Sequence, residues 1–154
     1  MRARDLMNAP IATCHVNDPL NVAAQRMWDR DCGALPVVND EGVLTGMITD
    51  RDICMAALTQ GKPLDDMLVN SAMSHHVVSI HPEQALSDAE LLMMHHQIRR
   101  VPVIDERGAP IGIISLNDIA LECAQPDSKL QHGAQKLART LAAICRPRVS
   151  GRAA

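Results

Sequence analysis

The feature that most constrains the fold of this chain is an internal repeat with a spacing of 66 residues, the separation of Leu35 from Val101. The stretch LPVVNDEGVLTGMITDRDI, which starts at Leu35, aligns without a gap with VPVIDERGAPIGIISLNDI, which starts at Val101. The same spacing continues upstream, where Met7 corresponds to Met73. A repeat of this length is typical of a duplicated structural unit. We therefore expect two copies of one small fold.

Each copy predicts the element order β-α-β-β-α. In the first copy, IATCHV is rich in β-branched residues and predicts a strand. An apolar stripe from Leu20 to Met27 follows at helical spacing, with Asp18 as the expected cap of that helix. The strands LPVV and VLTGMIT flank the turn NDEG, and DRDICMAAL predicts the closing helix.

A sheet of three strands with two helices buries too little surface to be stable alone. We therefore expect an α/β (α+β) fold in which two repeats pack with pseudo-twofold symmetry around a shared cleft, a usual location for ligands. The expected parts are a first repeat at 1–60, a linker at 61–70, a second repeat at 71–125, and a C-terminal helix with a basic tail at 126–154.

The C-terminal helix has no counterpart in the repeats. Leu137, Leu141, Ile144 and Cys145 lie close to one of its faces. This apolar face predicts that the helix packs on the repeats or on a second copy of the chain. The broad apolar faces of the other helices also favour a homodimer.

Composition excludes several classes of partner. The net charge is −3, which gives no general attraction to nucleic acid, and the chain has one Trp, no Tyr and no Phe. Single-stranded nucleic acids are usually held by aromatic stacking, so we expect no nucleic-acid partner. No signal-like segment or apolar stretch of about 18 residues is present, so we expect a cytoplasmic protein with no membrane partner. The five cysteines form no C-x-x-C pair, which predicts reduced thiols.

A hydroxyl residue followed three positions later by Asp occurs once in each repeat, as Thr49 with Asp52 and as Ser115 with Asp118. This spacing matches the capping box, in which both residues only close a helix N-terminus. A helix N-terminus is also an anion site, and a carboxylate one turn inside the helix can accept hydrogen bonds from a vicinal diol such as ribose. Both interpretations stay open on spacing alone.

Glycines inside two predicted strands favour the second interpretation. Gly46 and Gly112 precede the hydroxyl residues by three positions. Glycine inside a strand usually marks the close approach of a ligand or of another backbone. A hydroxyl and amides for phosphate, together with a carboxylate for sugar, suit a nucleotide.

The repeated motif resembles the CBS domain, named for cystathionine β-synthase, and the tandem resembles a Bateman module. ALPVVNDEGVLTGMITDRDI and RRVPVIDERGAPIGIISLNDI carry the resemblance, which covers Met7 to about Ala124. The layout is also similar to small stand-alone bacterial CBS-pair proteins of the stress or hypoxic-response type. The resemblance implies a non-enzymatic module that binds AMP, ADP or ATP, or else NAD or S-adenosylmethionine, between the repeats. Such a module would act in signal transduction as an energy or stress sensor, with no cofactor, and an unidentified protein would respond to its shape.

The resemblance also implies a role for each matching position. Asp52 and Asp118 would bind ribose hydroxyls, and Thr49 and Ser115 would bind phosphate or ribose oxygens. The other candidate ligand-binding residues are Thr13 and Ser79 as pocket hydroxyls, Leu35, Pro36, Val101 and Pro102 as walls for adenine, Arg51, Arg99 and Arg100 for phosphate, and Asn117.

Two other functions are open. In the first, the chain is an interaction or scaffold protein whose hydroxyl–Asp pairs are only caps. In the second, it is a metal- or redox-responsive regulator that uses the doublets His75-His76 and His95-His96 and its thiols. Adjacent residues point in different directions, so a doublet seldom supplies two ligands to one ion, and we predict no metal site. The two Asp lie in equivalent copies, which fits duplicated binding better than acid–base catalysis, so no catalytic residue is expected.

Overall fold

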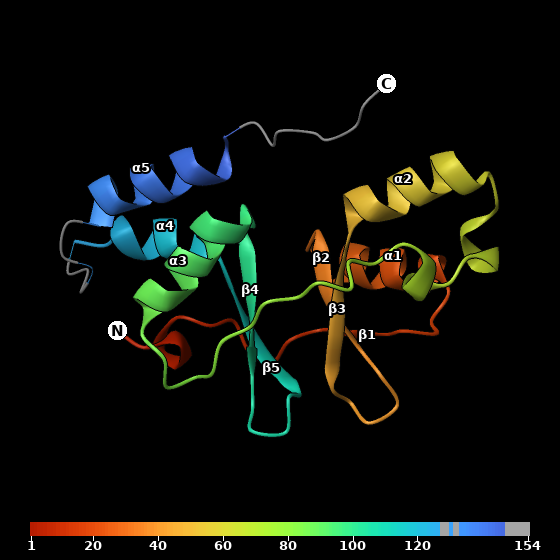
Figure 1. Cartoon of the computed structure of the whole chain (residues 1–154), viewed down its shortest axis with the longest axis horizontal. Helices are drawn as coiled ribbons and strands as arrows, with labels where there is room; N and C mark the ends of the chain where they lie inside the picture. Colours follow the sequence, from red (N-terminus) through yellow and green to blue (C-terminus); the bar gives the residue numbers. More distant parts are fainter. Residues whose placement is uncertain (127–129, 131–132, 147–154) are drawn as a thin grey trace.

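The computed structural model describes residues 1–126, 130 and 133–146. Its longer elements are β1 (Cys14–His15), α1 (Leu20–Asp29), β2 (Ala34–Val38), β3 (Leu44–Thr49), α2 (Asp50–Gln60), α3 (Leu86–His96), β4 (Arg100–Ile104), β5 (Pro110–Ser115), α4 (Leu116–Cys123) and α5 (Gly133–Ile144). Short 3-10 helices form η1 (Ala3–Asp5), η2 (Leu64–Asp66) and η3 (Val69–Ser71). The two sheets lie in the middle of the molecule, with α1 and α2 outside one sheet and α3, α4 and α5 outside the other (Figure 1).

The first repeat has the expected β-α-β-β-α order, whereas the second has a shorter first strand. In the first sheet β1 pairs parallel to β2, and β2 pairs antiparallel to β3. The second sheet consists of β4 and β5. In place of a strand equivalent to β1, this repeat has a single parallel bridge from Ile80 to Val103. Val16 N donates to Val38 O in the first repeat, at 3.0 Å. The corresponding residue of the second repeat is Pro82, which has no N–H to donate, so the strand ends earlier.

Both hairpins form at the predicted turns. Gly42 and Gly108 adopt positive φ angles of 76° and 82°, which glycine reaches without steric cost. The side chains of Asn39 and Asp105 accept backbone N–H groups from within each turn. Each hairpin also has a register shift at the same place, so the two copies agree in detail.

The first helix begins one residue later than expected, and Asp18 does not cap it. Pro19 occupies the N-cap position of α1 in an extended conformation, which leaves Asp18 outside the helix. Asp18 Oδ2 instead accepts hydrogen bonds from His15 N at 2.9 Å and from Arg26 Nη1 at 2.8 Å. Asp18 therefore stabilises the turn before α1 and not the helix N-terminus.

Two separate cores form, and each is completed by a segment that precedes the other repeat. The first core, around Leu35 and Ile48, includes Met67 and Val69 from the segment expected to be a linker. The second core includes Ala3 from the N-terminus of the chain. Figure 1 shows both segments crossing between the halves. Residues 61–70 thus do more than join the repeats, because they carry buried core residues.

The crossing segments also pair with the sheet of the opposite half. Asn8 bridges Ile113 of β5, and Ser74 bridges Met47 of β3. The glycines of these strands make room for the crossing segments. A Cβ added to Gly46 would lie 2.6 Å from the carbonyl oxygen of Ser74, and one added to Gly112 would lie 2.7 Å from Sδ of Met7. Close approach of another chain segment therefore accounts for both glycines.

Helix α5 packs on α3 and α4 of the second repeat, which confirms that the C-terminal helix covers the module. Its buried face differs from the expected one: Leu137, Thr140 and Ile144 face inward, whereas Leu141 and Cys145 are exposed. The basic tail expected beyond residue 146 lies outside the described residues. No helix in the described part of the chain is both long enough and apolar enough to cross a membrane.

Candidate functional site

The first hydroxyl–Asp pair forms a complete capping box at the start of α2. Thr49 is the N-cap, and its side chain accepts a hydrogen bond from Asp52 N at 3.1 Å. Asp52 Oδ2 accepts hydrogen bonds from Thr49 N at 2.9 Å and from the Thr49 hydroxyl at 2.7 Å. The cap therefore uses one of the two carboxylate oxygens of Asp52.

The second pair repeats this arrangement at the start of α4. Ser115 is the N-cap and accepts a hydrogen bond from Asp118 N at 3.3 Å. Asp118 Oδ2 accepts from Ser115 N at 2.7 Å and from the Ser115 hydroxyl at 2.6 Å. Capping alone thus explains both pairs without a ligand, although it does not use the whole carboxylate.

The second carboxylate oxygens distinguish the two sites. An ionised carboxylate has about four lone-pair sites, so a cap and a diol can share it. Oδ1 of Asp52 has no hydrogen-bond partner among the described residues. Oδ1 of Asp118 accepts a hydrogen bond from Asn8 Nδ2 at 2.8 Å. The two motifs are the same in sequence, but only Asp52 offers an unused oxygen.

The candidate arginines are also distributed unequally. Arg100 starts β4 of the second repeat, opposite Ser115 in register, but its guanidinium reaches toward the first repeat. A Cβ added to Gly33 would lie 3.7 Å from Arg100 Nη2 and 2.9 Å from Asp50 Oδ2. Arg100 therefore brings positive charge close to the N-terminus of α2, on the side of Gly33 where the Asp50 carboxylate also lies.

Three other polar candidates lie at the same helix N-termini with exposed side chains. Arg51 is in the first turn of α2, Asn117 is in the first turn of α4, and Arg99 precedes β4. The carbonyl oxygen of Arg99 accepts from Leu116 N at 2.9 Å, which fixes the backbone of Arg99 beside α4.

The structure places only some of the expected pocket hydroxyls and adenine walls where a ligand could meet them. Thr13 and Ser79 are half-buried, and Thr13 lies one residue before β1 rather than within a strand. Leu35 and Val101 belong to the two cores, so their side chains face the helices and not the space between the repeats. Because side chains alternate along a strand, the buried Pro36 and Pro102 lie on the opposite faces of β2 and β4 and stay candidates for an adenine wall.

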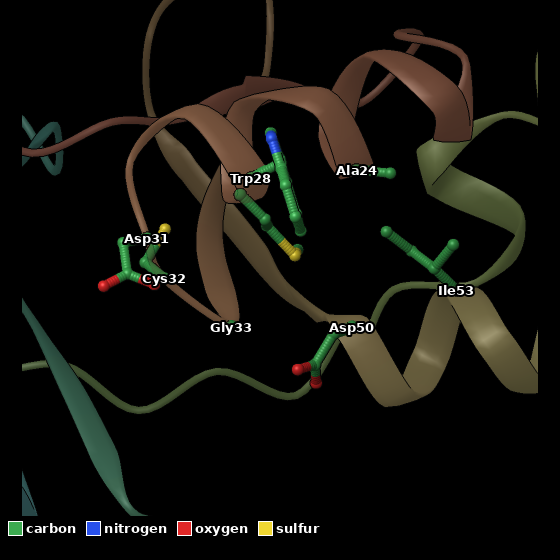
Figure 2. A pocket seen from close by; sticks show the side chains of 8 residues that line it. Ala24, Trp28, Asp31, Cys32, Gly33, Asp50 and Ile53 are labelled. Carbon is green, nitrogen blue, oxygen red and sulfur yellow. The ribbon is translucent and has the colours of Figure 1, made fainter.

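A cavity of about 420 Å³ lies between α1 and α2 of the first repeat, and its lining includes Gly33 and Asp50, which are close to Arg100. Figure 2 shows Ala24 and Trp28 of α1 and Asp50 and Ile53 of α2 around it. In the second repeat, the positions equivalent to Ala24 and Ile53 are Glu90 and Ile119, and α5 packs over that surface. The cavity is therefore the first repeat's counterpart of the surface that α5 covers.

Sequence reasoning missed Asn8, Ser74 and Asp50 as members of these sites. Asn8 and Ser74 correspond in the repeat and follow the paired Met7 and Met73, so their equivalence was visible in the sequence. Their proximity to the motifs was not, because Asn8 and Asp118 are 110 residues apart. Asp50 stands inside the first motif, but nothing in the spacing indicates that it lies on the same side of Gly33 as the Arg100 guanidinium.

The histidines and thiols of the metal- or redox-responsive alternative are placed as follows. Within the described residues, no group of three or more His, Cys, Asp or Glu side chains is placed to hold a metal ion. All five cysteines are free. Burial raises the pKa of the Cys14 thiol from 9.0 to about 12, and burial and the Glu90 carboxylate raise that of Cys123. Both thiols are therefore protonated and poorly nucleophilic at neutral pH.

Comparison with known proteins agrees with the duplicated motif. The family model of the CBS domain matches residues 3–59 and 69–125. The chain is 41% identical to the CBS domain-containing protein YhcV of Bacillus subtilis over 118 residues, which cover 77% of this chain and 82% of YhcV. It is 36% identical to Hypoxic response protein 1 of Mycobacterium tuberculosis, with the same coverage of both chains.

Solved structures show the same architecture. The crystal structure of Hypoxic Response Protein I, with two coordinated zinc ions, matches with a TM-score of 0.72 and 34% identity, over 82% of this chain and all of that chain. The CBS domain pair of protein MJ0100, in complex with 5′-methylthioadenosine and S-adenosyl-L-methionine, matches with a TM-score of 0.71 and 26% identity, over 79% of this chain and 94% of that chain.

Proposed function

The chain belongs to the CBS-domain family, and from this we propose that it is a non-enzymatic regulatory module that binds an adenine nucleotide between its two repeats. The observation that carries the proposal is the unused Oδ1 of Asp52, held one turn inside α2 by its capping box. The bound 5′-methylthioadenosine and S-adenosyl-L-methionine of the MJ0100 pair support an adenosine-containing ligand.

The site offers a separate partner for each part of such a ligand. Asp52 accepts hydrogen bonds from the ribose diol through Oδ1, while Oδ2 continues to cap the helix. The phosphate lies near the N-terminus of α2, where the helix dipole favours an anion and where Arg51 and Arg100 supply positive charge. Adenine packs against aliphatic side chains, in keeping with a chain whose one aromatic residue, Trp28, is 84% exposed on the outer side of α1.

Regulation follows if the ligand prefers one arrangement of the repeats over another. A ligand shifts an equilibrium only by the difference in its affinity for the two states. The ligand would contact both halves, because Asp52 belongs to the first repeat and Arg100 to the second. We propose that a cytoplasmic homodimer transmits this change to a downstream protein, as an energy or stress sensor.

Isothermal titration calorimetry with AMP, ATP, NAD and S-adenosylmethionine tests the proposal. The variant D52N/D118N keeps an oxygen for each cap but replaces the other carboxylate oxygen with an amide donor. We expect binding to the native chain and a loss of at least about tenfold in affinity in the double variant. Asp65→Ala, which removes an exposed carboxylate from η2, is the matched control and should bind like the native chain.

A scaffold function without a ligand is the second candidate, because both capping boxes are complete in the structure. It predicts that none of these nucleotides raises the melting temperature, and that Thr49→Ala costs only the roughly 0.5–2 kcal/mol of a lost helix cap. Absence of binding to all four ligands, or equal binding by D52N/D118N, would exclude the nucleotide proposal and leave this one.

A further inference from the structure

We infer that only the first of the two repeated sites binds the nucleotide, because Asn8 closes the second. The inference rests on the proposed function and adds which site is used and how the other is blocked. It depends on one pair of equivalent residues, Asn8 and Ser74, which hold the same backbone position in the two halves but carry different side chains.

The backbones at these two positions are held in the same way. Asn8 N donates to Ile113 O at 2.9 Å, and Ile113 N donates to Asn8 O at 3.2 Å. Ser74 N donates to Met47 O at 2.8 Å, and Met47 N donates to Ser74 O at 3.1 Å. Each residue therefore lies beside the strand that leads into a capping box. The Cβ atoms of Asn8 and Ser74 have equivalent positions in the two halves.

The side chains then behave differently because they differ in length. The Asn8 amide extends one bond further than a serine hydroxyl, and its Nδ2 donates to Asp118 Oδ1 at 2.8 Å. The Ser74 hydroxyl donates to His76 O at 3.3 Å and does not contact Asp52. A ribose diol at Asp118 would compete with Asn8 for Oδ1, which already accepts a hydrogen bond, whereas a diol at Asp52 competes with no protein group for that oxygen.

Charge favours the same site. The guanidinium of Arg100 belongs to the second repeat by sequence but extends to Gly33 and Asp50 of the first. It therefore adds a positive charge close to the N-terminus of α2, where a phosphate would lie. Both differences point to the Asp52 site, although the two motifs are equivalent in sequence.

Exchange of the two side chains tests the inference, with AMP as the calorimetric probe and the full chain throughout. We expect one AMP per native chain. Asn8→Ser installs the residue of the other half and should raise the stoichiometry to two. Adding D118N to N8S should return it to one. Ser74→Asn should weaken binding at Asp52 by about tenfold, if the amide takes Oδ1 as Asn8 does at Asp118.

The outcomes separate this inference from the proposed function. Two AMP molecules per native chain, or one AMP that D118N removes and D52N does not, would overturn the inference while leaving nucleotide binding intact. A stoichiometry of one in a folded N8S variant would also overturn it. If neither the native chain nor any variant binds AMP, ATP, NAD or S-adenosylmethionine, the proposed function itself fails. Because D52N and D118N each keep a capping oxygen, their comparison does not depend on N8S.

Discussion

Thr49 and Asp52 serve the helix first and the proposed ligand second. The capping box satisfies N–H groups that the first turn of α2 would otherwise leave without partners, and such caps contribute roughly 0.5–2 kcal/mol. The same contacts lock the Asp52 side chain in one orientation. A ligand that meets this carboxylate does not need to order it, which lowers the entropic cost of binding. At the scale of the residue, stability and the proposed function therefore reinforce each other.

The thiols provide a test at the same scale. Burial, and secondarily the Asp18 carboxylate, raise the pKa of Cys14 to about 12 against the opposing effect of Arg26. We expect iodoacetamide to modify the exposed Cys54 and Cys145 of the native protein quickly and Cys14 last at every pH between 7 and 9. Peptide mass mapping over time measures the order. Modification of Cys14 as fast as Cys54 would contradict the burial argument.

The raised pKa of Cys14 also has a defined effect on stability. Well below pH 9 the thiol is protonated in both the folded and the unfolded chain, so it adds no pH dependence there. Between pH 9 and about 12 the unfolded chain loses this proton and the folded chain keeps it, so Cys14 favours unfolding as pH rises.

At the scale of the element, α5 makes the two halves unequal. It covers the surface formed by α3 and α4, whereas the equivalent surface of α1 and α2 is open in the cavity of Figure 2. One ion pair marks this difference: Lys136 of α5 pairs with Glu90, whose side chain is 4% exposed, and the first repeat has Ala24 at that position. Gln97 Nε2 also donates to Ala143 O at 3.3 Å and to Arg146 O at 3.0 Å, which holds the end of α5.

Removal of Lys136 alone should therefore destabilise the protein more than removal of Lys136 together with its partner Glu90. Lys136→Met leaves a buried carboxylate unpaired, and we expect a loss of about 1–3 kcal/mol in the free energy of unfolding, since Lys136 is half exposed. E90A/K136M places at position 90 the alanine that the first repeat has at position 24, and its free energy of unfolding should fall less. Urea denaturation measures both, with Arg139→Met on an exposed position of α5 as the control. If the double variant were as unstable as K136M, the unpaired Glu90 carboxylate would not be the cause of the lost stability.

At the scale of the whole molecule, the two halves are interlocked rather than only stacked. Each core takes buried residues from the segment that precedes the other repeat, and each sheet pairs with that segment. The turns also meet, because Leu44 N donates to Gly108 O at 2.9 Å. The second core needs Ala3, which the whole first repeat separates from it in the chain, and the crossing segments pair with both sheets, so we expect the two halves to unfold together.

A buried residue of the expected linker tests this interlocking. Met67 is 2% exposed in the first core, whereas its neighbour Leu68 is 46% exposed. We expect Met67→Ala to cost about 2–5 kcal/mol, as for a buried core side chain, and Leu68→Ala to cost clearly less. Urea unfolding followed by Trp28 fluorescence and by far-UV circular dichroism should give one coincident transition. Equal costs for the two variants would show that the segment is only a connection.

The sequence by itself determined the features that depend on neighbours in the chain. The repeat, both hairpin turns and both capping boxes were predictable, because a cap joins residues three apart and a turn depends on Gly42 or Gly108 at its end. The early end of the strand at Ile80 follows from Pro82, which is present in the sequence. The expectation of two identical copies nevertheless led to a full strand being predicted there.

Only the tertiary structure decided how the copies differ. The apolar pattern marks Met67 and Ala3 as core residues but does not say which of two similar cores each enters. The hydrogen bond of Asn8 to Asp118 and the closeness of Arg100 to Gly33 involve residues far apart in the chain, so no local spacing encodes them. Caps and turns form between residues close in the chain, so their spacing can be read from the sequence. The position of Asn8 beside Asp118 depends on how the two halves pack. That packing leaves Asp52, and not Asp118, with a carboxylate oxygen open to a ligand.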